Sequence, residues 1–240
     1  SDMERVNGRE NHMGEGYGFS ARAVWRPINT DQTTVHFGFS AVARTPERVT
    51  SDDGIVAVGG RSGSVVENRK FIAGGFSGID HYTICDLEAA YRDDRFFVQG
   101  EALCSTFATK ERPGVITNGA KTYNIDGSES VSFWGGYLVG SYMLRGKQRS
   151  YSNSGAVFSN VNNEVEPGGN VELMIGASAI DTQGYMGQAY EALGAVNWYP
   201  NTAMMLGLSY TFTSFSKDAV ALGRLRSNSD DGLSYQTLQL

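Results

Sequence analysis

Proline and cysteine are scarce in this chain of 240 residues, which contains five prolines and two cysteines. Two cysteines are too few for a disulfide scaffold, and they lack the spacing of metal ligands. No stretch approaches the ~18 consecutive apolar residues that a membrane-spanning helix requires. A helical membrane protein is therefore excluded. A membrane protein built of β-strands is not excluded, because only every second side chain of such a strand faces lipid.

Positive charge and catalytic motifs are also in short supply. The formal net charge is −6, whereas nucleic-acid-binding domains are usually basic, so we expect no nucleic-acid partner. The three histidines lie far apart, at positions 12, 36 and 81. The chain has no Gly-x-Ser-x-Gly elbow and no phosphate-cradling loop that ends in Gly-Lys-Ser/Thr. We therefore expect no enzyme activity, no cofactor and no metal site.

Apolar side chains recur at every second position in many segments. In 33–44 the alternating apolar residues are Val35, Phe37, Phe39, Ala41 and Ala43. A period of two predicts β-strands. The same pattern predicts nine strands in all, at 19–26, 33–44, 81–92, 96–106, 131–144, 171–180, 189–199, 203–213 and 235–240.

The connections between these strands are of two kinds. Three are tight, at 26–33, 92–95 and 199–202, and three are long and polar, at 45–80, 108–128 and 214–232. Short turns at one rim and long loops at the other are typical of outer-membrane barrels, whose short turns face the periplasm. Alternating strand direction places all three tight turns at one rim. It also places the long segment 145–170 there, which is unusual.

The predicted fold is an all-β, antiparallel transmembrane β-barrel. Strands of about ten residues exceed the ~5 to 6 residues usual in soluble proteins, and aromatic residues gather near the strand ends, as in barrel girdles. The alternative is a soluble β-sandwich that binds a ligand, in which the apolar side of each strand faces a compact core.

Six segments in order resemble the second half of the phosphate-selective porins O and P. They include Leu-Glu-Ala-Ala-Tyr at 87–91 with Phe-Val-Gln-Gly-Glu at 97–101, and Leu-Gly-Ala-Val-Asn-Trp-Tyr-Pro-Asn at 193–201. The others are 16–28 followed by 35–38, then 136–146 and the closing Tyr-Gln-Thr-Leu-Gln-Leu at 235–240.

This resemblance implies a homotrimer of sixteen-stranded barrels in the lipid of the outer membrane of a Gram-negative bacterium. An arginine ladder and a lysine cluster would guide phosphate-like anions through each barrel. The nine strands would be about the eighth through the sixteenth, so we expect a single porin domain over 1–240, the carboxy-terminal portion of a barrel, with a polar N-terminal segment at 1–15. The first half and the usual terminal aromatic are missing.

Cationic donors inside the lumen would replace the hydration that an anion loses, and arginine suits phosphate because its planar fork bonds two oxygens. Arg22 and Arg26 lie on one strand with side chains ~13 Å apart on the same side. The predicted anion-guiding residues on the polar face are Arg22, Arg26, Arg44, Arg92 and His36. The alternative for Arg26, Arg44 and Arg92 is that they end strands at the headgroup rim.

Acidic residues also fall on the polar faces of the strands, and these are Asp86, Glu88, Glu101, Glu172 and Glu191. Five carboxylates would repel anions unless they pair with arginines from neighbouring strands. Carboxylates on one wall and arginines on another would produce a transverse field, as in general porins. A cation-selective or nonselective pore therefore stays open as an alternative.

Cys85 and Cys104 fall on the apolar faces of consecutive strands, and a tight turn near 94–95 would set them directly opposite. A cross-strand disulfide is then possible in the oxidising periplasm. The alternative is that they are two small apolar residues facing lipid.

We expect the complete barrel to migrate differently in SDS gels before and after boiling, because a closed barrel satisfies its backbone hydrogen bonds internally and resists detergent. A protein that purifies without detergent, stays monomeric and shows the same mobility in both samples would instead be the sandwich.

Overall fold

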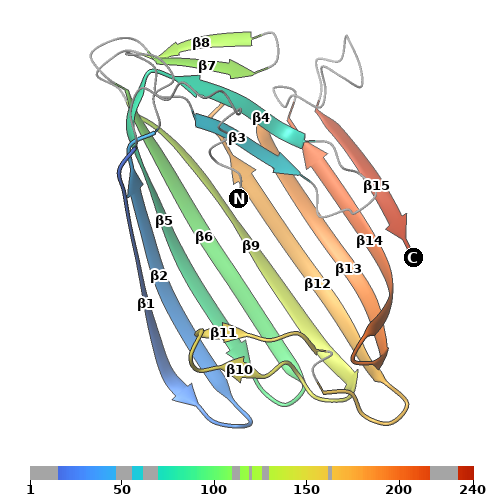
Figure 1. Ribbon diagram of the computed structural model, residues 1–240. Coiled ribbons are helices and arrows are strands. Elements are labelled where there is room, and N and C mark those ends of the chain that lie inside the picture. Colours follow the sequence, from blue (N-terminus) through green and yellow to red (C-terminus); the bar gives the residue numbers. More distant parts are fainter. Residues whose placement is uncertain are drawn as a thin grey trace.

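The computed structural model describes residues 16–46, 56–61, 70–109, 114–118, 121–125, 130–161, 164–216 and 232–240. Nine long strands form one antiparallel sheet in the order β1-β2-β5-β6-β9-β12-β13-β14-β15, which curves into an open trough (Figure 1). The strands are β1 Gly18–Asn29, β2 Thr34–Arg44, β5 Ile79–Arg92, β6 Phe96–Thr109, β9 Ser130–Arg145, β12 Asn170–Asp181, β13 Gln188–Asn201, β14 Met204–Phe215 and β15 Leu233–Gln239. All nine predicted strands are confirmed. Within the described ranges no helix is long and apolar enough to cross a membrane.

Alternation gives the sheet an apolar convex face. Phe37 and Phe39 of β2 are 44% and 46% exposed, and the ring of Phe37 stacks on Trp25 of β1 with 5.7 Å between centroids. Other exposed apolar residues follow the same parity on neighbouring strands, among them Phe19, Leu87, Leu138, Ile175, Val196, Leu208 and Tyr210. A sandwich would bury this face, so its exposure contradicts the soluble alternative for the described sheet.

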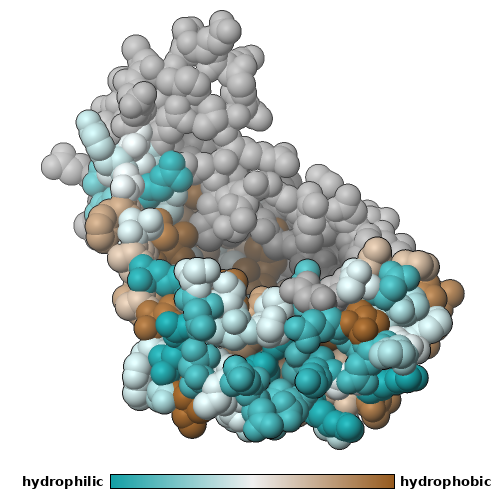
Figure 2. Space-filling model, turned by 60° about the horizontal axis from the view of Figure 1, so that its bottom comes forward, coloured by the Kyte–Doolittle hydropathy of each residue, from teal (hydrophilic) through white to brown (hydrophobic). Residues whose placement is uncertain are grey.

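The two ends of the sheet differ as predicted. The turns at 29–34, 92–96 and 201–204 lie at one end together with the segment 145–170 (Figure 1). Viewed from this end, the surface is covered mainly by hydrophilic residues (Figure 2). We call this end of the sheet the short-turn rim. The connection between β12 and β13, at 181–188, is the one short connection at the other end among the described residues.

The long connections contain strands where the sequence predicted loops. β3 Val56–Arg61, β4 Lys70–Ser77, β7 Gly114–Asn118 and β8 Lys121–Ile125 form a second, four-stranded sheet. Phe76 of β4 is buried against Phe107 and Phe133 of the large sheet, with ring centroids 4.8 and 5.4 Å apart. These rings lie on the concave side, because their parity is opposite to that of the exposed residues. The core that these three rings form fixes the second sheet at the end of the large sheet opposite the short-turn rim (Figure 1).

The turn between β5 and β6 is fastened by one carboxylate. Asp93 Oδ1 accepts hydrogen bonds from the backbone N–H groups of Arg95, at 2.9 Å, and Phe96, at 2.7 Å. Partial burial raises the pKa of Asp93, but these hydrogen bonds outweigh it and hold the pKa below its ordinary value. The turn thus depends on an ionised aspartate.

Replacing Asp93 with Ala should lower the free energy of unfolding by about 1 kcal/mol at pH 7, because two backbone donors lose their acceptor. The depressed pKa means that this stabilisation is complete above the unfolded value of about 4 and declines as the pH falls through the folded value. Urea unfolding followed by tryptophan fluorescence should therefore show a gap between wild type and variant that shrinks below about pH 4. A gap that is constant with pH would contradict the role of the carboxylate.

Candidate functional site

The segment 145–170 folds back into the trough instead of leaving the rim. Its short strands β10 Tyr151–Ser152 and β11 Val157–Phe158 pair as a hairpin that lies across the concave face (Figure 1). Arg26 Nη1 donates to Asn153 Oδ1 at 2.7 Å, and His36 Nδ1 lies 2.8 Å from the hydroxyl of Tyr151. We call residues 145–170 the inward segment. It narrows the space on the concave side of β1, β2, β5 and β6.

A buried ion pair anchors the inward segment to the wall. Arg149 Nη2 donates to Glu172 Oε1 at 2.8 Å, and the Glu172 side chain is fully buried. Its other oxygen accepts hydrogen bonds from Tyr199, at 2.8 Å, and Asn197, at 3.3 Å. The Arg149 guanidinium also lies 4.3 Å from the centre of the Phe97 ring. Each charge therefore has a partner, as a stable buried pair requires.

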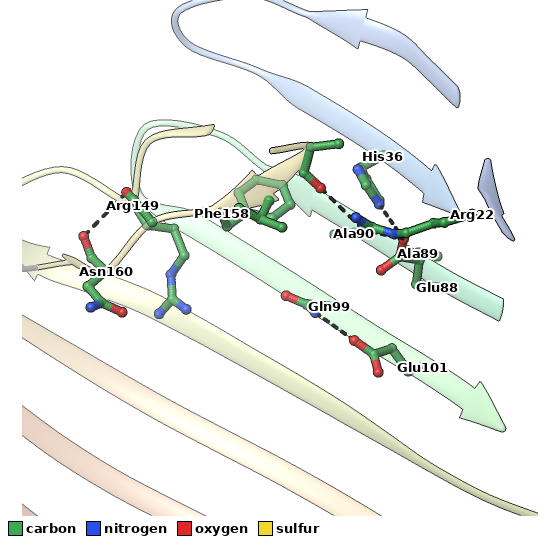
Figure 3. Close-up of a pocket in the computed structure, with 13 residues that line it drawn as sticks. Arg22, His36, Glu88, Ala89, Ala90, Gln99, Glu101, Arg149, Phe158 and Asn160 are labelled. Carbon is green, nitrogen blue, oxygen red and sulfur yellow. Dashed lines mark hydrogen bonds and ion pairs between the residues drawn. The ribbon is translucent and has the colours of Figure 1, made fainter. Parts of the chain in front are cut away.

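A polar cavity of about 230 Å³ lies between the inward segment and the wall. Figure 3 shows how side chains from β1, β2, β5, β6 and the inward segment surround it. Its charged and polar lining comes from Arg22, His36, Glu88, Gln99, Glu101, Arg149, Ser159 and Asn160. We call it the mixed-charge pocket.

One carboxylate organises the arginine side of the mixed-charge pocket. Arg22 donates to Glu88 Oε1 from both Nε, at 2.9 Å, and Nη2, at 2.5 Å. His36 Nε2 lies 3.3 Å from the same oxygen. Gly38 stands opposite Glu88 in the ladder, and a Cβ there would collide with the Glu88 carboxylate. The absence of a side chain at Gly38 therefore gives the Glu88 carboxylate the space to reach Arg22.

The other carboxylates near the mixed-charge pocket have neutral partners. Glu101 Oε1 accepts hydrogen bonds from Tyr137, at 2.6 Å, and from Gln99, at 3.2 Å. Asp86 Oδ2 lies 3.5 Å from Ser40 Oγ, and its Oδ1 is buried without a hydrogen bond. Neutral donors orient a carboxylate but leave its charge in place. The wall at β5 and β6 is therefore locally acidic.

A second polar cavity, of about 390 Å³, opens at the short-turn rim. Arg92 lines it, and its Nη2 donates to the carbonyls of Thr30 and Asp31 and to Thr34 Oγ1, each at 3.1 Å. Lys147 lines this rim cavity as well, and Arg149 lines both cavities. The guanidinium of Arg149 therefore bridges the mixed-charge pocket and the rim.

The structure brings four of the predicted site residues together, namely Arg22, His36, Glu88 and Glu101. Arg26 contacts the hairpin, where its guanidinium lies 5.5 Å from the centre of the Tyr151 ring. Arg92 lies at the rim cavity, and Arg44 lies exposed at the opposite end of β2. Glu172 is covered by the inward segment, and Glu191 accepts a hydrogen bond from Thr213 at 3.0 Å.

Sequence reasoning missed Arg149, because it lies in an irregular segment without alternation. The one signal was the strand parity that placed 145–170 at the short-turn rim, where a long connection is unusual. It also missed Tyr137 and Gln99, whose hydrogen bonds to Glu101 depend on the register between β6 and β9. Within the described residues no group of three or more His, Cys, Asp or Glu is placed to hold a metal ion.

Cys85 and Cys104 are direct partners in the β5–β6 ladder, as the tight turn implied. Both thiols are free. A disulfide between them stays a prediction.

Replacing Glu172 with Gln should release the inward segment, because the partly buried Arg149 would then lose its counter-charge, a loss of up to about 3 kcal/mol. Limited proteolysis of the folded protein should cut within 150–160 faster than in wild type. Glu191→Gln is the matched control, since Glu191 lies on the same face and accepts a hydrogen bond from Thr213 of the neighbouring strand. Equal cleavage of both variants would contradict the anchor.

The sheet has an apolar convex face, a polar trough and a segment folded into that trough. The family model described as phosphate-selective porin O and P matches residues 3–236, nearly the whole chain. A comparison with curated proteins finds no match. The chain belongs to the phosphate-selective porin O and P family.

Proposed function

We propose that this chain forms the wall of a passive outer-membrane channel for small solutes, with a preference for phosphate and similar anions. The observation that carries the proposal is the mixed-charge pocket, where Arg22 and Arg149 reach the polar space between the inward segment and the wall. Membership of a family of outer-membrane porins supports the location and the solute class.

Arginines held by carboxylates suit a channel better than free arginines. A solute must bind well enough to enter and weakly enough to leave. Glu88 holds the Nε side of Arg22, and Glu172 holds Arg149, so both guanidiniums are fixed in place and partly neutralised. A phosphate would exchange some of its water for their remaining N–H groups. It would then move along Arg149 towards Arg92 and Lys147 at the rim cavity.

The second candidate function is a cation-preferring or nonselective pore. It is favoured by Glu101, whose hydrogen-bond partners are neutral, and by Asp86, whose Oδ1 has no hydrogen bond. Two such carboxylates on β5 and β6 would attract cations. The two candidates differ in the sign of the reversal potential in a salt gradient.

The described sheet has two edge strands, β1 and β15. An open edge exposes unpaired backbone groups, which is not tolerated in the hydrocarbon of a membrane. We propose that further strands close the ring to sixteen, with the apolar convex face against outer-membrane lipids, and that three such barrels assemble as a homotrimer in a Gram-negative bacterium.

Planar-bilayer recordings of the complete porin should give an anion-selective reversal potential. Arg22→Gln should lower the anion-to-cation permeability ratio by a factor of about 5, as expected for ~1 kcal/mol of short-range Coulomb energy in water. Glu88→Gln should raise this ratio.

Arg95→Gln is the matched control for this experiment, because Arg95 lies exposed in the turn between β5 and β6 and lines neither polar cavity. Its reversal potential should equal that of wild type. Cation selectivity in the wild type would favour the second candidate. Unchanged potentials in Arg22→Gln would remove Arg22 from the selectivity mechanism.

A further inference from the structure

His36 is the one predicted anion-guiding residue that carries no permanent charge. It lies on the trough side of β2 and lines the mixed-charge pocket beside Arg22 and Glu88 (Figure 3), and the residue is only 3% exposed. Histidine is the side chain whose ordinary change of charge falls between pH 5 and 8. The proton on this imidazole therefore contributes to the charge of the pocket.

Both ring nitrogens of His36 have partners, and these partners come from different parts of the fold. Nε2 lies 3.3 Å from Glu88 Oε1 on β5, and Nδ1 lies 2.8 Å from the Tyr151 hydroxyl of the inward segment. An ionised carboxylate only accepts hydrogen bonds, so Nε2 carries the hydrogen of the neutral ring and Nδ1 accepts from Tyr151. Burial raises the pKa of the Tyr151 hydroxyl, which keeps this donor protonated. The neutral imidazole is thus satisfied at both nitrogens.

The charged and titratable groups that face His36 come from every element packed against it. Arg22 of β1 donates to the same Glu88 oxygen that His36 contacts. The charges of Arg22 and Glu88 oppose one another, so the imidazole decides whether these three groups are neutral together or carry one positive charge. The other charged or titratable groups are Arg26 of β1, Asp86 of β5, Glu101 of β6, and Tyr151 and Arg149 of the inward segment.

Protonation of His36 affects its two contacts in opposite ways. The imidazolium gains a charge-assisted contact with Glu88, whereas a hydrogen on Nδ1 turns the Tyr151 hydroxyl from donor into acceptor. An adjacent carboxylate favours the charged form of a group, and a hydrogen bond to the neutral form disfavours it. Glu88 on the wall and Tyr151 on the hairpin therefore control the same proton from opposite sides.

We propose that His36 is a specificity-determining residue that makes the anion preference of the channel depend on pH. At low pH the imidazolium adds a positive charge to the mixed-charge pocket, so anions enter more readily. At high pH the pocket relies on its arginines alone. The inference rests on the proposed channel function and deepens it, because the proton regulates the same site.

Reversal potentials of the complete porin in a potassium chloride gradient test the proposal at pH 5 and pH 8. Chloride is the probe because its charge, unlike that of phosphate, is constant over this range. Lowering the pH should raise the chloride-to-potassium permeability ratio of wild type about fivefold, the factor expected for one short-range unit charge in water. His36→Gln retains a polar side chain without a titrating proton, so it should show no such rise.

His81→Gln is the matched control, because His81 lies exposed near the other end of β5 and does not line the mixed-charge pocket. It should retain the full rise. Tyr151→Phe removes the donor to the neutral imidazole, so the midpoint of the pH dependence should move to higher pH. A merely structural role of His36 would not move this midpoint. An NMR titration of the histidine signals of the complete porin in detergent, assigned with His36→Gln, should show the same shift without any current.

An unchanged permeability ratio in wild type would overturn the proposal. A rise that persists in His36→Gln would also overturn it, because the titrating group would then be another one, such as Asp86. Equal midpoints in wild type and Tyr151→Phe would contradict the assigned hydrogen bond. Failure of the proposed function looks different. In that case the protein would be cation-selective at both pH values or give no current, while the NMR midpoint of His36 would still move in Tyr151→Phe.

Discussion

The alternation of side chains along hydrogen-bonded strands is the constraint on which every other feature depends. The nine strands pair along antiparallel ladders, so their backbone groups bond to neighbouring strands and their side chains cover the two faces. Because successive side chains point to opposite faces, Phe37 and Phe39 face outwards while His36 and Gly38 face the trough. The same ladder thus separates an apolar convex face from a polar concave one.

The inward segment turns this wall into a site. A bare polar trough would hold water and leave solutes without defined contacts. The Arg149–Glu172 pair fixes the segment from one side, and the contacts of Arg26 and His36 with the hairpin fix it from the other. The mixed-charge pocket is therefore bounded by elements that hydrogen bonds and an ion pair hold in place.

Charge pairing gives the carboxylates on the trough wall two different roles. Glu88 and Glu172 each hold an arginine in place, so they position cations and do not simply repel anions. Glu101 and Asp86 accept hydrogen bonds from neutral side chains instead. The trough wall therefore carries two kinds of carboxylate, and an arginine count alone would not distinguish them.

The sequence by itself determined the nine strands, their inward and outward faces and the rim at which each turn lies, because these follow from local period and parity. Even the Cys85–Cys104 register followed from the length of one turn. It did not reveal the strands within the long connections, whose order depends on a core shared with Phe107 and Phe133. Only the tertiary structure decided that Glu88 holds Arg22, 66 residues away, and that Arg149 enters the pocket. Such contacts join segments whose sequences carry no local sign of one another.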